Sequence, residues 1–243
     1  MSDYQQHQDV SRGTLSRARE IDQGLRAYMM QVYNYMMAGV ALTGVVAYGV
    51  YYMSTQNAAF AQLMYNSPLK WVIMLAPLGM VFFLSARMHK MSYGGAQIAF
   101  WAFAALMGAS LSYIFLRYGG TSITRVFFIS AAAFGALSLY GYTTKKDLSG
   151  WGTFLFMGLI GIIIASIVNI FLASSALQFA VSVIGVLIFS GLTAYDTQRI
   201  KEAYYEGHGY ETLGKLAIMG ALSLYLDFIN LFMSLLSLFG SSE

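Results

Sequence analysis

Two aspartates lie in long apolar segments, where a carboxylate is costly and therefore informative. Asp227 lies about twelve residues into the last apolar segment, in LSLYLDFINLF, which is roughly 18 Å at 1.5 Å per residue. Asp196 lies in GLTAYDTQRIKEAYY, which has no helix breaker before Gly207. If these segments span a bilayer, each carboxylate near its centre costs about 2.5–3.5 kcal/mol. The two positions therefore point to chemistry carried out by carboxylates within a membrane.

The two carboxylates are expected to meet. If the helix that carries Asp196 continues to about residue 205 and the last helix runs back antiparallel, Asp196 and Asp227 reach similar depths. Two close carboxylates in a low-dielectric site cannot both stay ionised, so they share a proton. Such a pair is a proton-sensitive or cation-binding element.

Simpler roles are open for both residues. Asp196 can lie at the rim of the bundle and pair with Arg199 or Lys201, three and five positions further on. Asp227 can be buried and hydrogen-bonded to neighbouring hydroxyls and amides, such as Asn230.

Three further polar residues belong to the candidate site. Arg87 ends the second apolar segment, where it either anchors the helix at the interface or reaches inward to latch one aspartate. Tyr195 and Asn230 are candidate supporting polar groups, because they neighbour the aspartates along the chain.

The composition indicates which elements must position these residues. Of 243 residues, 58% are hydrophobic and only 10% are charged, whereas soluble domains carry about 25% charged residues. A spanning helix needs about 20 mostly apolar residues, and runs such as GLIGIIIASIVNIFL do not alternate as membrane β-strands do. We predict an all-α integral membrane bundle, with a polar tail over residues 1–26 and one transmembrane domain over 27–240. Its seven spans lie near residues 28–53, 71–88, 97–117, 124–143, 151–172, 177–198 and 215–239.

The packing and orientation of the spans also follow from the sequence. The long charge-free run before Tyr195 must turn near Asn169 and Ser174–Ser175. Eleven Lys and Arg residues fall on the side of the N-terminus and three on the other, which predicts a cytoplasmic N-terminus and an external C-terminus. Six glycines are expected to let the helices approach closely: Gly135, Gly158, Gly161, Gly185, Gly191 and Gly220.

Several classes of function are disfavoured. The three histidines, His7, His89 and His208, lie outside the spans and far apart, which argues against a metal site and an intramembrane Ser–His protease. The last span has no lysine for a retinal Schiff base, and there is no phosphate loop. The basic residues stand singly, unlike those of a nucleic-acid surface. We therefore expect no enzyme, no cofactor and no nucleic-acid partner, with the lipid bilayer as the surroundings.

Three motifs carry a family resemblance. They are FGALSLYGYTTKKDLS (134–149), IFSGLTAYDTQRIK (188–201) and LSLYLDFINLF (222–232). In this order and spacing, they resemble the Bax inhibitor family, also called the transmembrane Bax-inhibitor-motif family, and its bacterial branch in particular. The resemblance covers about residues 20–240. It implies a seven-helix bundle in a bacterial inner membrane, which agrees with the spans above.

The resemblance also implies an activity. Members of the family look like pH-sensitive pathways that leak calcium, and the paired aspartates that act as their pH sensor fall here on Asp196 and Asp227. The pairing arginine of the family falls on Arg87. Calcium is then the permeant ion, held transiently near the aspartates and not at a fixed metal site. Because the segment between Lys70 and Arg87 has no acidic residue, we expect no additional ion site there.

The resemblance allows a second reading as well. Members restrain cell death in eukaryotes, and bacterial relatives have been linked to a membrane quality-control protease. The chain can therefore be a regulatory protein that binds a membrane protease or another membrane complex, with the tail over residues 1–26 as its contact. The sequence does not set the oligomeric state.

Overall fold

A computed structural model describes residues 2–241 of the chain, with side chains from residue 22 onward. Within these residues, all regular structure is helical and there is no strand, which confirms the all-α prediction. The helices are α1 (Ser2–Gln56), α2 (Ala58–Ala61), η1 (Gln62–Asn66), α3 (Leu69–Arg87), η2 (Met88–Lys90), α4 (Tyr93–Leu111), α5 (Ile114–Arg117), α6 (Gly120–Thr143), α7 (Ser149–Leu172), α8 (Ser175–Glu202) and α9 (Tyr210–Phe239).

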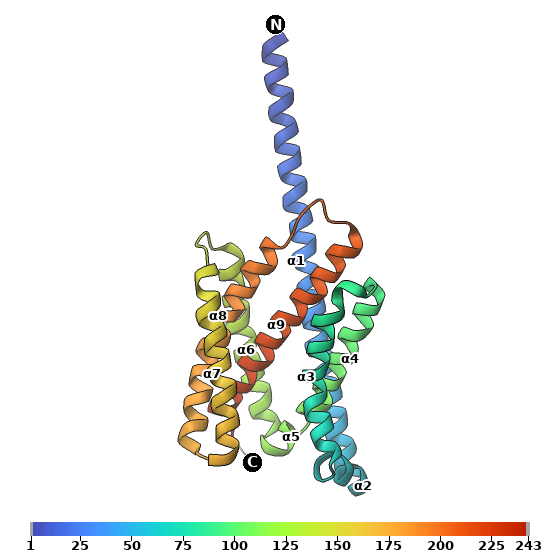
Figure 1. Cartoon of the computed structure of the whole chain (residues 1–243), viewed down its shortest axis with the longest axis vertical. Helices are drawn as coiled ribbons and strands as arrows, with labels where there is room; N and C mark the ends of the chain where they lie inside the picture. The colour runs from blue at the N-terminus through green and yellow to red at the C-terminus, as the bar shows by residue number, and fades with distance from the viewer. Residues whose placement is uncertain (1, 242–243) are drawn as a thin grey trace.

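Within the described part of the chain, seven helices are long and apolar enough to cross a membrane, as predicted, and the ends of these segments lie within about six residues of the expected positions. The helix α1 begins at Ser2, so that the residues predicted as a separate polar tail continue the first spanning helix. This extension stands clear of the bundle (Figure 1). The spanning segments are Asp22–Gln56, Leu69–Lys90, Tyr93–Arg117, Gly120–Thr143, Ser149–Leu172, Ser175–Glu202 and Tyr210–Phe239.

The turn between α7 and α8 lies where the sequence predicts it. The last residue before the turn, Ala173, adopts the left-handed conformation with φ 48° and ψ 33°. The Asn169 side chain accepts a hydrogen bond from the Ser174 backbone N–H at 3.0 Å, and the Ser174 hydroxyl caps α8 by accepting from Leu177. The two polar residues therefore satisfy the helix ends that the apolar sequence leaves open.

The last helix, α9, is the centre of the bundle. It crosses the other helices diagonally in Figure 1 and packs against α8, α1, α6 and α4. Its Tyr225 is fully buried, and the hydroxyl meets that of Thr43 at 2.6 Å, while Thr43 donates to the Ala104 carbonyl at 2.8 Å. A motif in the last span is thereby tied to α1 and α4.

Small residues set the spacing of α7, α8 and α9. A Cβ atom added to Gly158, Gly185 or Gly191 would overlap a side chain of the facing helix, and one at Gly220 would press tightly against Ile200. The prediction of close approach is wrong for Gly135 and Gly161, where an added Cβ would have no neighbour within 4 Å. Both glycines lie on helix surfaces that no other helix covers closely, and helix periodicity alone does not show which surfaces these are.

The closest approach of a glycine to backbone is at Gly141 of α6, whose added Cβ would collide with the backbone carbonyl of Ala194 in α8. We expect Gly141→Val to push these helices apart at a cost of about 1–3 kcal/mol, because backbone cannot move aside as a side chain can. This corresponds to a fall of about 2–12 °C in the thermal unfolding midpoint, measured in detergent. Gly161→Val, in open space on α7, is the control, and an equal fall in both variants would contradict the packing argument.

Candidate functional site

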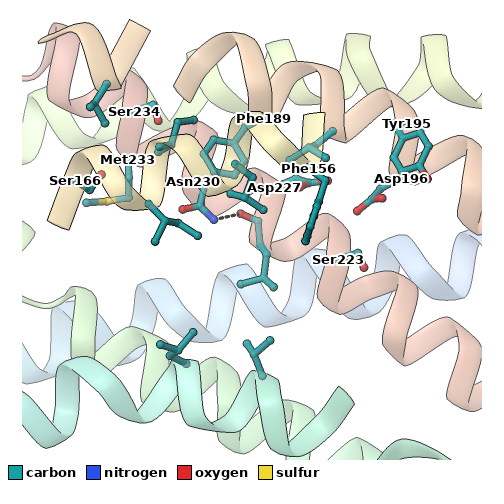
Figure 2. Close-up of a pocket in the computed structure, with 18 of the residues that line it drawn as sticks. Phe156, Ser166, Phe189, Tyr195, Asp196, Ser223, Asp227, Asn230, Met233 and Ser234 are labelled. Carbon is teal, nitrogen blue, oxygen red and sulfur yellow. Dashed lines mark hydrogen bonds between the residues drawn. The ribbon is translucent and has the colours of Figure 1, made fainter. Parts of the chain in front are cut away.

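A cavity of about 1000 Å³ lies between α3 and the group α7, α8 and α9. Most of its wall is aliphatic and aromatic, and Asp196 and Asp227 both contribute to it. Figure 2 shows Asp196 and Tyr195 toward one end of the cavity, with Asp227 and Asn230 nearer its middle. The antiparallel helices α8 and α9 pack side by side, so both carboxylates line one cavity, while their direct meeting and the shared proton stay predictions.

The carboxylate of Asp227 is almost completely enclosed. The residue is 5% exposed, and its Oδ2 atom has no hydrogen-bond donor among the described residues. Asn230 does not satisfy it, because the Asn230 amide donates to the Leu226 carbonyl at 2.8 Å, the dashed line of Figure 2. A buried carboxylate oxygen without a protein donor is met by a proton, water or a cation. The position therefore suits proton or cation chemistry better than structural hydrogen bonding.

Asp196 has a counter-ion on its own helix. Its Oδ1 atom lies 3.2 Å from Nη2 of Arg199, while the side chains are 11% and 55% exposed respectively. The guanidinium also lies 5.7 Å from the centre of the Tyr195 ring and 3.4 Å from the Ser223 hydroxyl of α9. This pair is the rim arrangement that the sequence left open, but Asp196 is itself only 8% exposed and faces the cavity.

Arg87 lies elsewhere in this arrangement of the helices. It is exposed in the last turn of α3, and it forms no ion pair with any side chain between residues 22 and 241. The helix α3 packs mainly on α4, and the cavity separates it from α8 and α9. The counter-ion of Asp196 is Arg199, one of the two partners that the simpler reading of the sequence named for it.

A polar line along α9 extends the site beyond the residues singled out by sequence. Ser223, Asp227, Asn230 and Ser234 all line the cavity, with spacings of four, three and four residues. This is the repeat of one helix face, and it covers about 16 Å. The two serines were missed because single hydroxyls are common in membrane helices. Their spacing from Asp227 was the signal that could have identified them.

Gln198 is a second residue that the sequence analysis did not single out, although it lies in the TAYDTQRIK motif. It is 7% exposed and holds the loop between α6 and α7 with both ends of its amide. The Nε2 group donates to the Lys146 carbonyl at 2.8 Å, and Oε1 accepts from the Leu148 N–H at 2.7 Å. The motif therefore places a loop anchor two residues beyond Asp196.

We expect Gln198→Ala to loosen this loop without unfolding the bundle. The loss of two hydrogen bonds, at about 0.5–1.5 kcal/mol each, raises the population of the open loop roughly 5- to 150-fold. Trypsin cleavage after Lys145 and Lys146, followed by mass spectrometry in a regime where cleavage tracks opening, measures that population. Gln178→Ala, at the other end of α8 with one exposed contact of 3.4 Å to Ser237, is the control. Unchanged cleavage in Gln198→Ala would show that the loop is held by other contacts.

Comparison with known proteins agrees with the fold and the motifs. Residues 25–243 match the family model described as Inhibitor of apoptosis-promoting Bax1. The chain is 49% identical over 228 residues to protein RP147 of Rickettsia prowazekii, covering 94% of this chain and 95% of that one. It is 47% identical over 221 residues to the inner membrane protein YbhL of Escherichia coli K12, covering 90% and 93% of the two chains. A protein of Caulobacter vibrioides is 47% identical over 229 residues, with 92% of each chain covered.

These matches, together with seven apolar helices, place the chain as an integral protein of the bacterial inner membrane. The family match spans all seven helices and all three motifs. This chain therefore belongs to the Bax inhibitor family of membrane proteins.

Proposed function

We propose that this protein is a pH-sensitive, calcium-permeable leak pathway, gated by a proton shared between Asp196 and Asp227. One observation carries the proposal. Two nearly buried carboxylates from adjacent helices face one cavity, and an oxygen of Asp227 has no donor among the described residues. Acidic groups within a membrane are costly and mark ion or proton paths far more often than they serve packing.

The direction of the pH response follows from competition. A proton held between the two carboxylates lowers the negative charge of the cavity and occupies the oxygens that a cation needs. Loss of that proton restores two carboxylates to the cavity wall, and hard cations such as calcium bind oxygen ligands. Calcium flux should therefore rise as the pH is raised from 5 to 8.

The oxygen atoms that line the cavity suit the passage of calcium better than its tight binding. Resident calcium takes about six to eight oxygen ligands, and within residues 22–241 no three acidic or histidine side chains gather to hold a metal ion. Conduction requires sites that bind weakly enough to release the ion. Along α9, Ser223, Asn230 and Ser234 can provide such weak contacts on either side of Asp227.

The orientation of the pathway belongs to the same proposal. The excess of Lys and Arg lies at one end of the bundle in Figure 1, where the α1 extension joins the bundle, where α6 is connected to α7 and where α8 ends. By the positive-inside rule, this end faces the cytoplasm, with the N-terminus. The Asp196 end of the cavity then opens toward the cytoplasm.

The test is calcium flux into proteoliposomes across pH 5 to 8, with the purified protein against empty liposomes. We expect a flux that rises with pH and that the double variant Asp196→Asn, Asp227→Asn lowers and makes independent of pH. If the double variant keeps both the flux and its pH dependence, the aspartate gate is wrong. No flux above empty liposomes at any pH would reject the leak itself.

A second candidate is a regulatory protein that binds a membrane protease or another membrane complex. The observation that favours it is the extension of α1 beyond the span, from Ser2 to residue 21, which stands clear of the bundle (Figure 1). Removal of residues 2–21 separates the two functions. Loss of a co-purifying partner with unchanged flux would support the binding role, whereas loss of flux with no change in partners would argue against it.

A further inference from the structure

A second cavity, of about 810 Å³, lies as a groove between α1 and α6, with Phe228 of α9 also in its wall. The helix α1 packs on α4 and α9, and α6 packs on α8 and α9, so the groove separates two helices that share α9 as a neighbour. The hydroxyls of Tyr33 and Ser138 bridge it at 2.6 Å. Its size is within the range of about 300–1000 Å³ typical of ligand sites.

The lining of the groove is adaptable and apolar. Four methionines of α1 face it, and on the α6 side small residues leave room. An added Cβ at Gly135 would have no neighbour within 4 Å, so the groove has room for a ligand beside this residue. Methionine fills irregular gaps and adjusts to flexible ligands. The methionines are Met29, Met30, Met36 and Met37.

One end of the groove carries positive charge. Arg26 is part of the lining, and its pair with Asp22 is 3.8 Å long with both side chains more than 60% exposed, so it holds the guanidinium weakly. Tyr142 lines the same end. Lys201 lies 5.3 Å from the centre of the Tyr142 ring and donates to the Tyr142 carbonyl at 2.9 Å. Arg26 therefore places one cation in the groove itself, while Lys201 lies beside Tyr142 and outside the lining.

The length of the groove matches one leaflet of a bilayer. It follows α1 from Arg26 to Ala41 and α6 from Phe127 to Tyr142, sixteen residues in each case, whose fifteen rises of 1.5 Å span about 22 Å. A bilayer with its headgroups is about 40–45 Å thick, so that one leaflet is about 20–22 Å. A lipid that lies in the groove would place its acyl chain against the methionines and its headgroup beside Arg26.

We propose that the groove between α1 and α6 is a binding site for an anionic phospholipid, with its phosphate held by Arg26. The occupant is a lipid and not a second copy of this chain, because a second copy brings the same excess of cations to this end of the bundle. The site is separate from the Asp196–Asp227 cavity and does not depend on the leak.

The experiment measures lipid binding to the purified protein in detergent by native mass spectrometry, with phosphatidylglycerol and phosphatidylcholine as probes. Arg26→Gln should weaken phosphatidylglycerol binding about fivefold, since one basic residue near a charged headgroup contributes a factor of that order. Lys90→Gln is the matched control, because it removes an exposed charge outside the groove, in the turn between α3 and α4 that lies at the same end of the bundle in Figure 1. It should leave the affinity unchanged.

The apolar part is tested by Gly135→Leu, which fills the groove without a clash at Cβ. It should weaken both lipids at least fivefold, whereas Gly161→Leu, on α7 in open space, should not. Equal losses in Arg26→Gln and Lys90→Gln would reduce the effect to general surface charge and overturn the site. Unchanged binding in Gly135→Leu would place the lipid elsewhere. A dimer in micelles that Gly135→Leu dissociates would assign the groove to a second copy.

Discussion

Asp227→Asn is expected to lower calcium flux at pH 8 by at least about tenfold and to leave a flux that no longer changes between pH 5 and 8. The substitution preserves shape and removes the charge that is most deeply buried in the cavity. An interaction with a charged group contributes about 1.5–3 kcal/mol, and 1.4 kcal/mol is a factor of ten. With Asn at this position, no proton can be shared with Asp196, and so the pH response disappears with the flux.

Asp147→Asn is the matched control for this prediction. Asp147 is an exposed carboxylate in the loop between α6 and α7, outside the cavity. Hydrogen bonds from Ser149, including its backbone N–H at 2.8 Å, lower the pKa of Asp147. This carboxylate therefore stays charged throughout pH 5 to 8 and cannot supply the pH response. If Asp147→Asn flattened the profile and Asp227→Asn did not, the sensor would lie in the loop.

Much of the fold could be predicted because a bilayer imposes strong local rules. Each spanning helix must satisfy its backbone internally over about 20 apolar residues, so seven segments can be read without any knowledge of their packing. The break after Leu172 was predictable for the same reason, since Asn169 and Ser174 are the polar residues that can cap two helix ends. Counting along one helix also placed Asp227 within the last spanning segment, Tyr210–Phe239.

The parts that could not be predicted depend on how the helices face one another. Gly135 and Gly141 are six residues apart on α6, yet one borders an open groove and the other touches the backbone of α8. The same limit applies to the arginine. Sequence favoured Arg87 through the family resemblance, whereas the separation of α3 from α8 by the cavity leaves Arg199 as the partner of Asp196.

Arg199→Gln is expected to raise calcium flux at pH 8 about fivefold. The Arg199 guanidinium lines the cavity and neutralises Asp196, whose Oδ1 lies 3.2 Å from it. Its positive charge repels an entering cation, and its ion pair occupies a carboxylate oxygen that the cation would otherwise bind. Two unit charges 4 Å apart interact by about 4 kcal/mol near a protein surface. The Arg199 side chain is 55% exposed, and solvent reduces this to about 1 kcal/mol, or a factor of about five.

Two companion variants decide whether this effect belongs to Arg199. Arg199→Lys keeps the positive charge and should retain a flux close to that of the unmodified protein, which separates charge from packing against Tyr195. Arg87→Gln removes an arginine that is exposed at the end of α3 and outside the cavity lining, and it should leave the flux unchanged. If Arg87→Gln alters the flux and Arg199→Gln does not, Arg87 of α3 pairs with one of the aspartates during gating. The ion pair at Asp196 would then serve only to hold the cytoplasmic end of α8.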